Sequence, residues 1–159
     1  MKQKFIIMRD EIEDELQGIS LLVQSMQKAA AQELDGEIKK RALASILSDF
    51  YMAAERIFKI IVKEIDLELP EGEDWHKKIL RKVAVGLPQI RPPVIDKELF
   101  LRLEEYLKFR HLVRNIYGFQ LNYVLFEHLV QGLPAAAGAL KEQISMFLAK
   151  MQEVADSDQ

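Results

Sequence analysis

The sequence contains no cysteine, and this absence excludes several kinds of chemistry. Without thiols the chain forms no disulfides, holds no zinc through thiolates and has no cysteine nucleophile. A glycine-rich phosphate loop, a nucleophile elbow and a zinc signature are also absent. No apolar run is long enough for a membrane span or for the core of a signal peptide. We therefore expect a soluble, cytoplasmic protein that needs no metal and no cofactor and has no membrane association.

An excess of positive charge is lacking as well. The chain has 22 lysines and arginines against 25 aspartates and glutamates, a formal net charge of −3. Proteins that coat nucleic acids usually carry a positive excess, so any contact with RNA must come from a local basic site. The 159 residues, 49% hydrophobic and 30% charged, are typical of a globular chain. We expect one folded domain over residues 1–159.

Helical periodicity dominates the first half of the sequence. Apolar residues spaced by threes and fours predict a long helix over residues 5–30 and a second one over residues 43–65. The pair Asp35-Gly36 separates them, with Asp35 as the N-cap of the second helix. Pro70 ends this run, and a short helix follows over residues 74–85.

The second half predicts two more helices. Asp96 is the expected cap of a fourth helix that reaches Tyr117, with Gly118 as its left-handed stop. The last helix should run over residues 122–154, and Gly132 and Pro134 should bend it or split it in two. The expected fold class is therefore all-α, an antiparallel bundle of about four long helices and one short helix.

The fourth helix carries polar residues on the continuation of its buried face. At about 100° per residue, the apolar stripe of residues 99–107 extends through Arg110, Arg114 and Tyr117. Two arginines four residues apart repel each other, and burying them is costly unless an anion or a carboxylate faces them. A phosphate is the natural ligand of paired guanidinium groups, which predicts an anion site. The alternative is internal salt bridges, for example to Glu55 or Glu64.

Residues 110–118 resemble the active-site motif of the HEPN ribonucleases, which reads Arg-x-x-x-x-His-x-Tyr. Arg110 and Tyr117 match two of its named positions, and Asn115 stands where the motif has histidine. The toxin branch with nucleotidyltransferase antitoxins, the HepT-like group, has the longer form Phe-Arg-His-x-x-Arg-His-x-Tyr-Gly. The residues of this chain in register with that form are Phe109, Arg110, His111, Arg114, Tyr117 and Gly118.

This resemblance implies a HEPN toxin of a toxin–antitoxin pair, a homodimer and metal-independent endoribonuclease whose two motif helices line an RNA cleft. Arg110 would bind the phosphate and Arg114 would assist. Asn115 can form hydrogen bonds but cannot transfer a proton near neutral pH, so His111 would have to act as the base. Tyr117 matches the tyrosine that accepts AMP from the partner nucleotidyltransferase, which silences the toxin.

The alternative hypothesis is that the chain is a catalytically inactive HEPN module. It would dock the nucleotidyltransferase, or bind nucleotide or RNA, without cleaving anything. Asn115 is the residue that separates the two readings, because it removes the acid–base group. In the second reading His111 is a surface or interface histidine, and Tyr117 is a core or interface tyrosine with one hydrogen bond. A helical scaffold with no nucleotide role leaves the arginine pair unexplained.

Overall fold

The computed structural model describes residues 2–158, which form five α-helices and no β-strand. The helices are α1 (Lys2–Ala31), α2 (Gly36–Ile61), α3 (Trp75–Val83), α4 (Lys97–Asn115) and α5 (Tyr123–Ser157). Four of them are long and α3 is short, which confirms the predicted all-α class.

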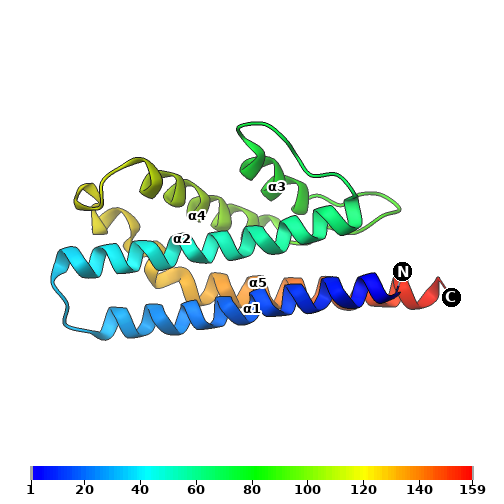
Figure 1. Cartoon of the computed structure of the whole chain (residues 1–159), viewed down its shortest axis with the longest axis horizontal. Helices are drawn as coiled ribbons and strands as arrows, with labels where there is room; N and C mark the ends of the chain where they lie inside the picture. The colour runs from blue at the N-terminus through cyan, green and yellow to red at the C-terminus, as the bar shows by residue number, and fades with distance from the viewer. Residues whose placement is uncertain (1, 159) are drawn as a thin grey trace.

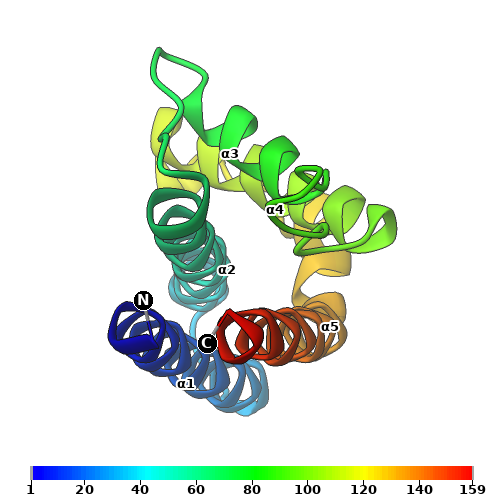
Figure 2. The ribbon, with the colours of Figure 1, turned by 90° about the vertical axis from the view of Figure 1, so that its right-hand side faces the viewer.

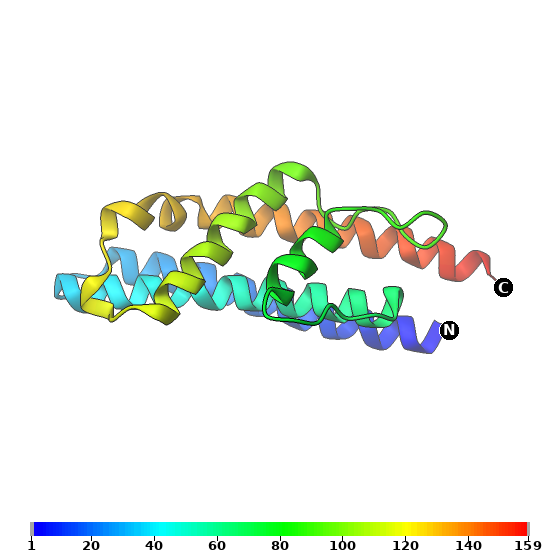
Figure 3. The same ribbon diagram turned by 90° about the horizontal axis from the view of Figure 1, so that it is seen from above.

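The four long helices form a bundle in which neighbours run in opposite directions (Figure 1). Helix α1 packs against α2 and α5, and α4 packs against the same two helices on the side away from α1 (Figure 2). Helix α4 crosses the bundle obliquely, and α3 lies on α2 and α4 (Figure 3). The predicted antiparallel arrangement is therefore confirmed.

Both predicted aspartate caps are present. The Asp35 side chain accepts a hydrogen bond from the backbone N–H of Glu37 at 2.9 Å, at the start of α2. Asp96 accepts one from the backbone N–H of Leu99 at 2.8 Å, at the start of α4. Each bond satisfies a helical N–H that has no partner within its own helix.

Helix α2 continues into a π-helical turn, η1 (Val62–Asp66), where the sequence predicted regular helix up to residue 65. Leu67 then turns the chain with a left-handed backbone, at φ 61°.

The buried Arg91 side chain holds this end by two hydrogen bonds to the Asp66 carboxylate, at 2.6 and 2.8 Å. It also donates to the backbone carbonyls of Lys82, Val85 and Pro92. The Arg91 side chain thus joins the end of α2 to the segment between α3 and α4 by a buried ion pair whose remaining donors are satisfied by backbone carbonyls.

Helix α5 continues past Pro134 without interruption. Figure 1 shows the first turns of α5 at an angle to the rest of the helix. Of the two predicted alternatives, a bend and a split into two helices, the bend is therefore the one that occurs. Proline removes one N–H from the helix and clashes with the preceding turn, which bends the axis. Near the bend, the buried Tyr106 hydroxyl of α4 donates to the Leu129 carbonyl at 2.8 Å.

Candidate functional site

A cleft of about 590 Å³ opens between α2 and the C-terminal half of α4. Its α2 wall comes from a face that recurs every three or four residues, and its other wall from α4 and the turn after it. The residues that line it are Arg41, Ala44, Ser45, Ser48, Asp49, Met52, Arg110, Val113, Arg114, Gly118 and Leu121. Two of the predicted site residues, Arg110 and Arg114, therefore lie together in one cleft.

Arg110 and Arg114 have no ionic partner among residues 2–158. Arg110 is half-buried and Arg114 is exposed, and no described carboxylate lies within 4.0 Å of either guanidinium. Glu55 instead contacts the Nδ1 atom of His76 at 2.7 Å, and Glu64 lies 3.9 Å from Lys63. The internal salt bridges considered for the arginine pair are therefore not formed.

A third arginine reaches the cleft from α2. Arg41 donates from Nε to Glu37 at 3.0 Å, and its guanidinium lies against Gly118. A Cβ atom on Gly118 would be only 2.8 Å from the Arg41 Cζ atom. The prediction that Gly118 is a left-handed helix stop is wrong, since Gly72 is the one described glycine with positive φ. The absent side chain leaves room for Arg41.

Helix α4 ends at Asn115, two residues earlier than the sequence predicted. The Asn115 side chain donates to the His111 carbonyl at 2.6 Å, a bond from a side chain back to the last turn of its own helix. Ile116 is then extended, at φ −131° and ψ 161°. Because the chain leaves the helical path here, the predicted inward position of Tyr117 on the buried stripe is wrong.

Tyr117 instead points into solvent. Its side chain is 71% exposed and stacks on Phe119, with ring centroids 5.4 Å apart. Its backbone N–H donates to the Gln120 side chain at 2.9 Å, which fixes the turn η2 (Gly118–Gln120). The tyrosine is thus accessible at the rim of the molecule, beside the glycine that borders the cleft.

His111 and Asn115 lie on another side of α4. Both are exposed, and neither lines the arginine cleft. At about 100° per residue they point roughly 100° and 140° away from Arg110. The structure therefore brings together Arg110 and Arg114 of the predicted set, and leaves His111 and Asn115 outside that cleft.

A buried tyrosine, Tyr51, lies near Arg110. The Tyr51 hydroxyl has no hydrogen-bond partner among the described residues. Burial raises its pKa well above the usual range, the nearby Glu55 raises it further, and Arg110 acts in the opposite direction. Tyr51 is therefore neutral at physiological pH and does not neutralise the charge of Arg110.

The residues of the α2 wall of the cleft were not predicted from the sequence. Arg41, Ser45, Ser48 and Asp49 recur at helical spacing, which was the available signal, but a polar stripe of this kind is more often a solvated face. Three arginines and one aspartate give the lining a formal charge of +2, whereas the whole chain carries −3. The cleft is thus a locally basic site on an acidic protein.

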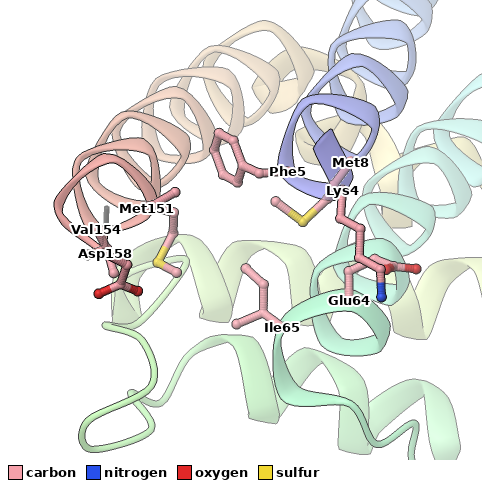
Figure 4. Close-up of a pocket in the computed structure, with 9 residues that line it drawn as sticks. Lys4, Phe5, Met8, Glu64, Ile65, Met151, Val154 and Asp158 are labelled. Carbon is pink, nitrogen blue, oxygen red and sulfur yellow. The ribbon is translucent and has the colours of Figure 1, made fainter. Parts of the chain in front are cut away.

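A second cavity, of about 230 Å³, lies at the opposite end of the bundle (Figure 4). Phe5 and Met8 of α1, Ile65 of η1 and Met151 of α5 give it apolar walls. It contains none of the predicted site residues. Lys4, Glu64 and Asp158 also line it and give a net formal charge of −1, so the arginine cleft is the better candidate for an anion site.

The described residues contain neither a candidate membrane-spanning helix nor a candidate metal site. None of their helices combines the length and apolar character that crossing a bilayer requires. Nor do residues 2–158 contain a group of three or more His, Asp or Glu side chains placed to hold a metal ion.

A family model described as HepT-like protein matches residues 42–151, which include most of α2 and the complete Arg110–Gly118 motif. The match covers 110 of 159 residues, so this chain belongs to the HepT-like protein family. Comparisons with curated proteins and with solved structures gave no match.

Proposed function

We propose that this chain is a HEPN-type toxin of a toxin–antitoxin pair, an endoribonuclease that acts without a metal ion and binds RNA through the arginine cleft. The observation that carries the proposal is the unpaired state of Arg110 and Arg114 in that cleft, among the described residues. Guanidinium groups without a carboxylate partner favour a phosphodiester, which accepts two parallel hydrogen bonds from each fork.

In the proposed reaction, Arg110 holds the phosphate and Arg114 assists. The neighbouring 2′-hydroxyl attacks phosphorus, the bond to the 5′-oxygen breaks, and a cyclic phosphate remains on the upstream fragment. The departing 5′-oxygen takes a proton from water and becomes the 5′-hydroxyl of the downstream fragment. His111 would accept the hydroxyl proton, since histidine titrates near neutral pH and Asn115 does not.

His111 points away from the arginine cleft of its own chain, so this role requires a second copy. Exposed apolar side chains surround the motif in residues 112–125, between the end of α4 and the start of α5. They are Leu112, Tyr117, Phe119, Tyr123, Val124 and Leu125. Such a surface favours a homodimer in which the two motif helices border a shared cleft.

A second candidate function is binding without cleavage. Asn115 occupies the histidine position, and its amide is engaged with the His111 carbonyl. An inactive module of this kind would dock the nucleotidyltransferase or hold nucleotide or RNA in the same cleft.

Incubation with total RNA separates the two candidates. The natural chain, an Asn115→His variant and a His111→Ala variant are compared under identical conditions with a chelator present. Cleavage by the natural chain that is lost in His111→Ala supports the nuclease. Cleavage only by Asn115→His supports the inactive module, and RNA retention that is lost in Arg110→Ala identifies the cleft as its binding site.

Regulation by adenylylation rests on Tyr117. In the proposed step the phenol oxygen bonds to the α-phosphorus of ATP, pyrophosphate leaves and the phenol proton is released. The side chain is exposed enough to enter another enzyme's active site. Mass spectrometry after incubation with the partner nucleotidyltransferase and ATP should find one AMP on Tyr117 and none on a Tyr117→Phe variant. An unmodified Tyr117 would contradict this part of the proposal.

A further inference from the structure

The arginine cleft contains a carboxylate that phosphate binding does not explain. Asp49 lies on the α2 wall, half-buried, in the same lining as Arg110 and Arg114. It forms no ion pair within 4.0 Å with any described residue, although three arginines line the same space. The cleft therefore offers two separate kinds of contact, guanidinium donors and a free carboxylate acceptor.

A carboxylate at this place is unfavourable for a ligand that consists of phosphate alone. Its negative charge repels the anion and lowers the potential that the arginines create. A partly buried carboxylate also loses hydration, and that loss needs compensation by hydrogen-bond donors. The arrangement becomes favourable when the ligand carries donors at a distance from its phosphate.

A serine in the same wall gives an independent indication of a ligand. The Ser48 Oγ atom is buried and has no hydrogen-bond partner among the described residues. It lies one residue before Asp49 and lines the cleft with it. A buried polar atom without a partner calls for an explanation, and rotation of the Ser48 side chain toward the cleft would bring its hydroxyl to a bound polar group.

We propose that Asp49 determines ligand specificity in this cleft by accepting a pair of adjacent hydrogen bonds from the nucleotide whose phosphate the arginines hold. This inference rests on the proposed function and names the ligand more closely. Two parts of a nucleotide present adjacent donors. They are the guanine edge, with its N1–H and N2–H groups, and the ribose diol, which is free in a mononucleotide and at the 3′ end of an RNA. The cleft volume of about 590 Å³ is in the range of small-ligand pockets.

Calorimetric titration at low salt tests the proposal with four probes: inorganic phosphate, GMP, dGMP and AMP. Preference for GMP and dGMP over AMP identifies the guanine edge, and preference for GMP and AMP over dGMP identifies the diol. We expect a preference of about tenfold, as a two-bond contact gives. In the Asp49→Asn variant this preference should vanish while phosphate still binds, and binds more tightly because one negative charge is gone.

The matched control is Asp14→Asn, which removes the same charge from an exposed position of α1 outside the cleft. It should keep the preference unchanged. Equal binding of the three nucleotides, or a preference that persists in Asp49→Asn, would overturn the inference and leave the phosphate site intact. Failure of phosphate itself to bind, with Arg110→Ala no different from the natural chain, would instead contradict the proposed function.

Discussion

At position 118, a missing side chain determines where an arginine lies. The Arg41 guanidinium occupies the space that a Cβ atom on Gly118 would need. The glycine backbone is not in the left-handed region, so the reason for glycine here is close approach and not conformational freedom. This contact between Arg41 and Gly118 joins the turn after α4 to the α2 wall of the cleft.

Gly118→Ala should therefore weaken anion binding with little effect on stability. The atom in the way is the end of a flexible side chain, so Arg41 can move aside and leave the cleft. We expect phosphate affinity to fall several-fold, since one of three guanidinium groups is displaced. Calorimetric titration with phosphate measures the first effect and thermal unfolding the second.

Gly138→Ala is the matched control, because nothing lies within 4 Å of a Cβ atom at that exposed position of α5. It should raise the free energy of unfolding by about 0.5–1 kcal/mol and leave phosphate affinity unchanged. Equal phosphate affinities of Gly118→Ala and the natural chain would mean that Arg41 takes no part in the site.

At the scale of the element, the end of α2 depends on one buried arginine. The Arg91 side chain is fully enclosed and so is the Asp66 carboxylate. The Arg91–Asp66 pair connects the π-helical turn η1 to the segment between α3 and α4. Arg91 also binds the Lys82 carbonyl of α3, so it ties the end of α2 to the end of α3.

Arg91→Met should destabilise the protein by about 3–5 kcal/mol, because it leaves the Asp66 carboxylate buried without a partner. Urea unfolding followed by circular dichroism measures the change. The control is Arg102→Met, which removes an exposed arginine paired with Glu98 one turn away, and should cost only about 0.5 kcal/mol or less. Similar losses in the two variants would show that the Arg91 pair is not the constraint that holds η1.

The helices were predictable from the sequence to the extent that local signals define them. The caps at Asp35 and Asp96 and the bend at Pro134 each depend on one residue and its neighbours. The end of α4 was not predictable in this way. The Asn115 side chain binds a carbonyl of its own last turn, and periodicity alone does not reveal that competition.

The same limit applies to the candidate site. Arg110 and Arg114 could be identified because a motif and a helical stripe both point to them. Arg41 and Asp49 are 61 to 73 residues away from Arg110 and Arg114 in the sequence, and only the packing of α2 against α4 brings them into the same cleft. The pairing of helices is a property of the whole core, so a local pattern does not carry it.

At the scale of the whole molecule, one end of the bundle presents apolar side chains to solvent. The segment of residues 112–125 contains six of them, each at least 36% exposed. This end carries the motif turn, and the apolar pocket of Figure 4 lies at the other end of the bundle. A surface of this kind on one end is typical of an interface, and a second copy of the chain is the partner that the proposed reaction requires.

Leu125→Lys should therefore convert a dimer into a monomer. Leu125 is 69% exposed and lies in the first turn of α5, so a lysine there is harmless to the isolated fold. In a dimer it would place a charge in an apolar contact and raise the dissociation constant about tenfold or more. Sedimentation velocity over a concentration series measures the shift, and Leu21→Lys on α1, also an exposed leucine, is the control.

If His111 serves the cleft of the other copy, RNA cleavage should fall in parallel with dimer content and recover at high protein concentration. A monomeric natural chain, or a Leu125→Lys dimer with unchanged affinity, would remove this end of the bundle from the proposed assembly.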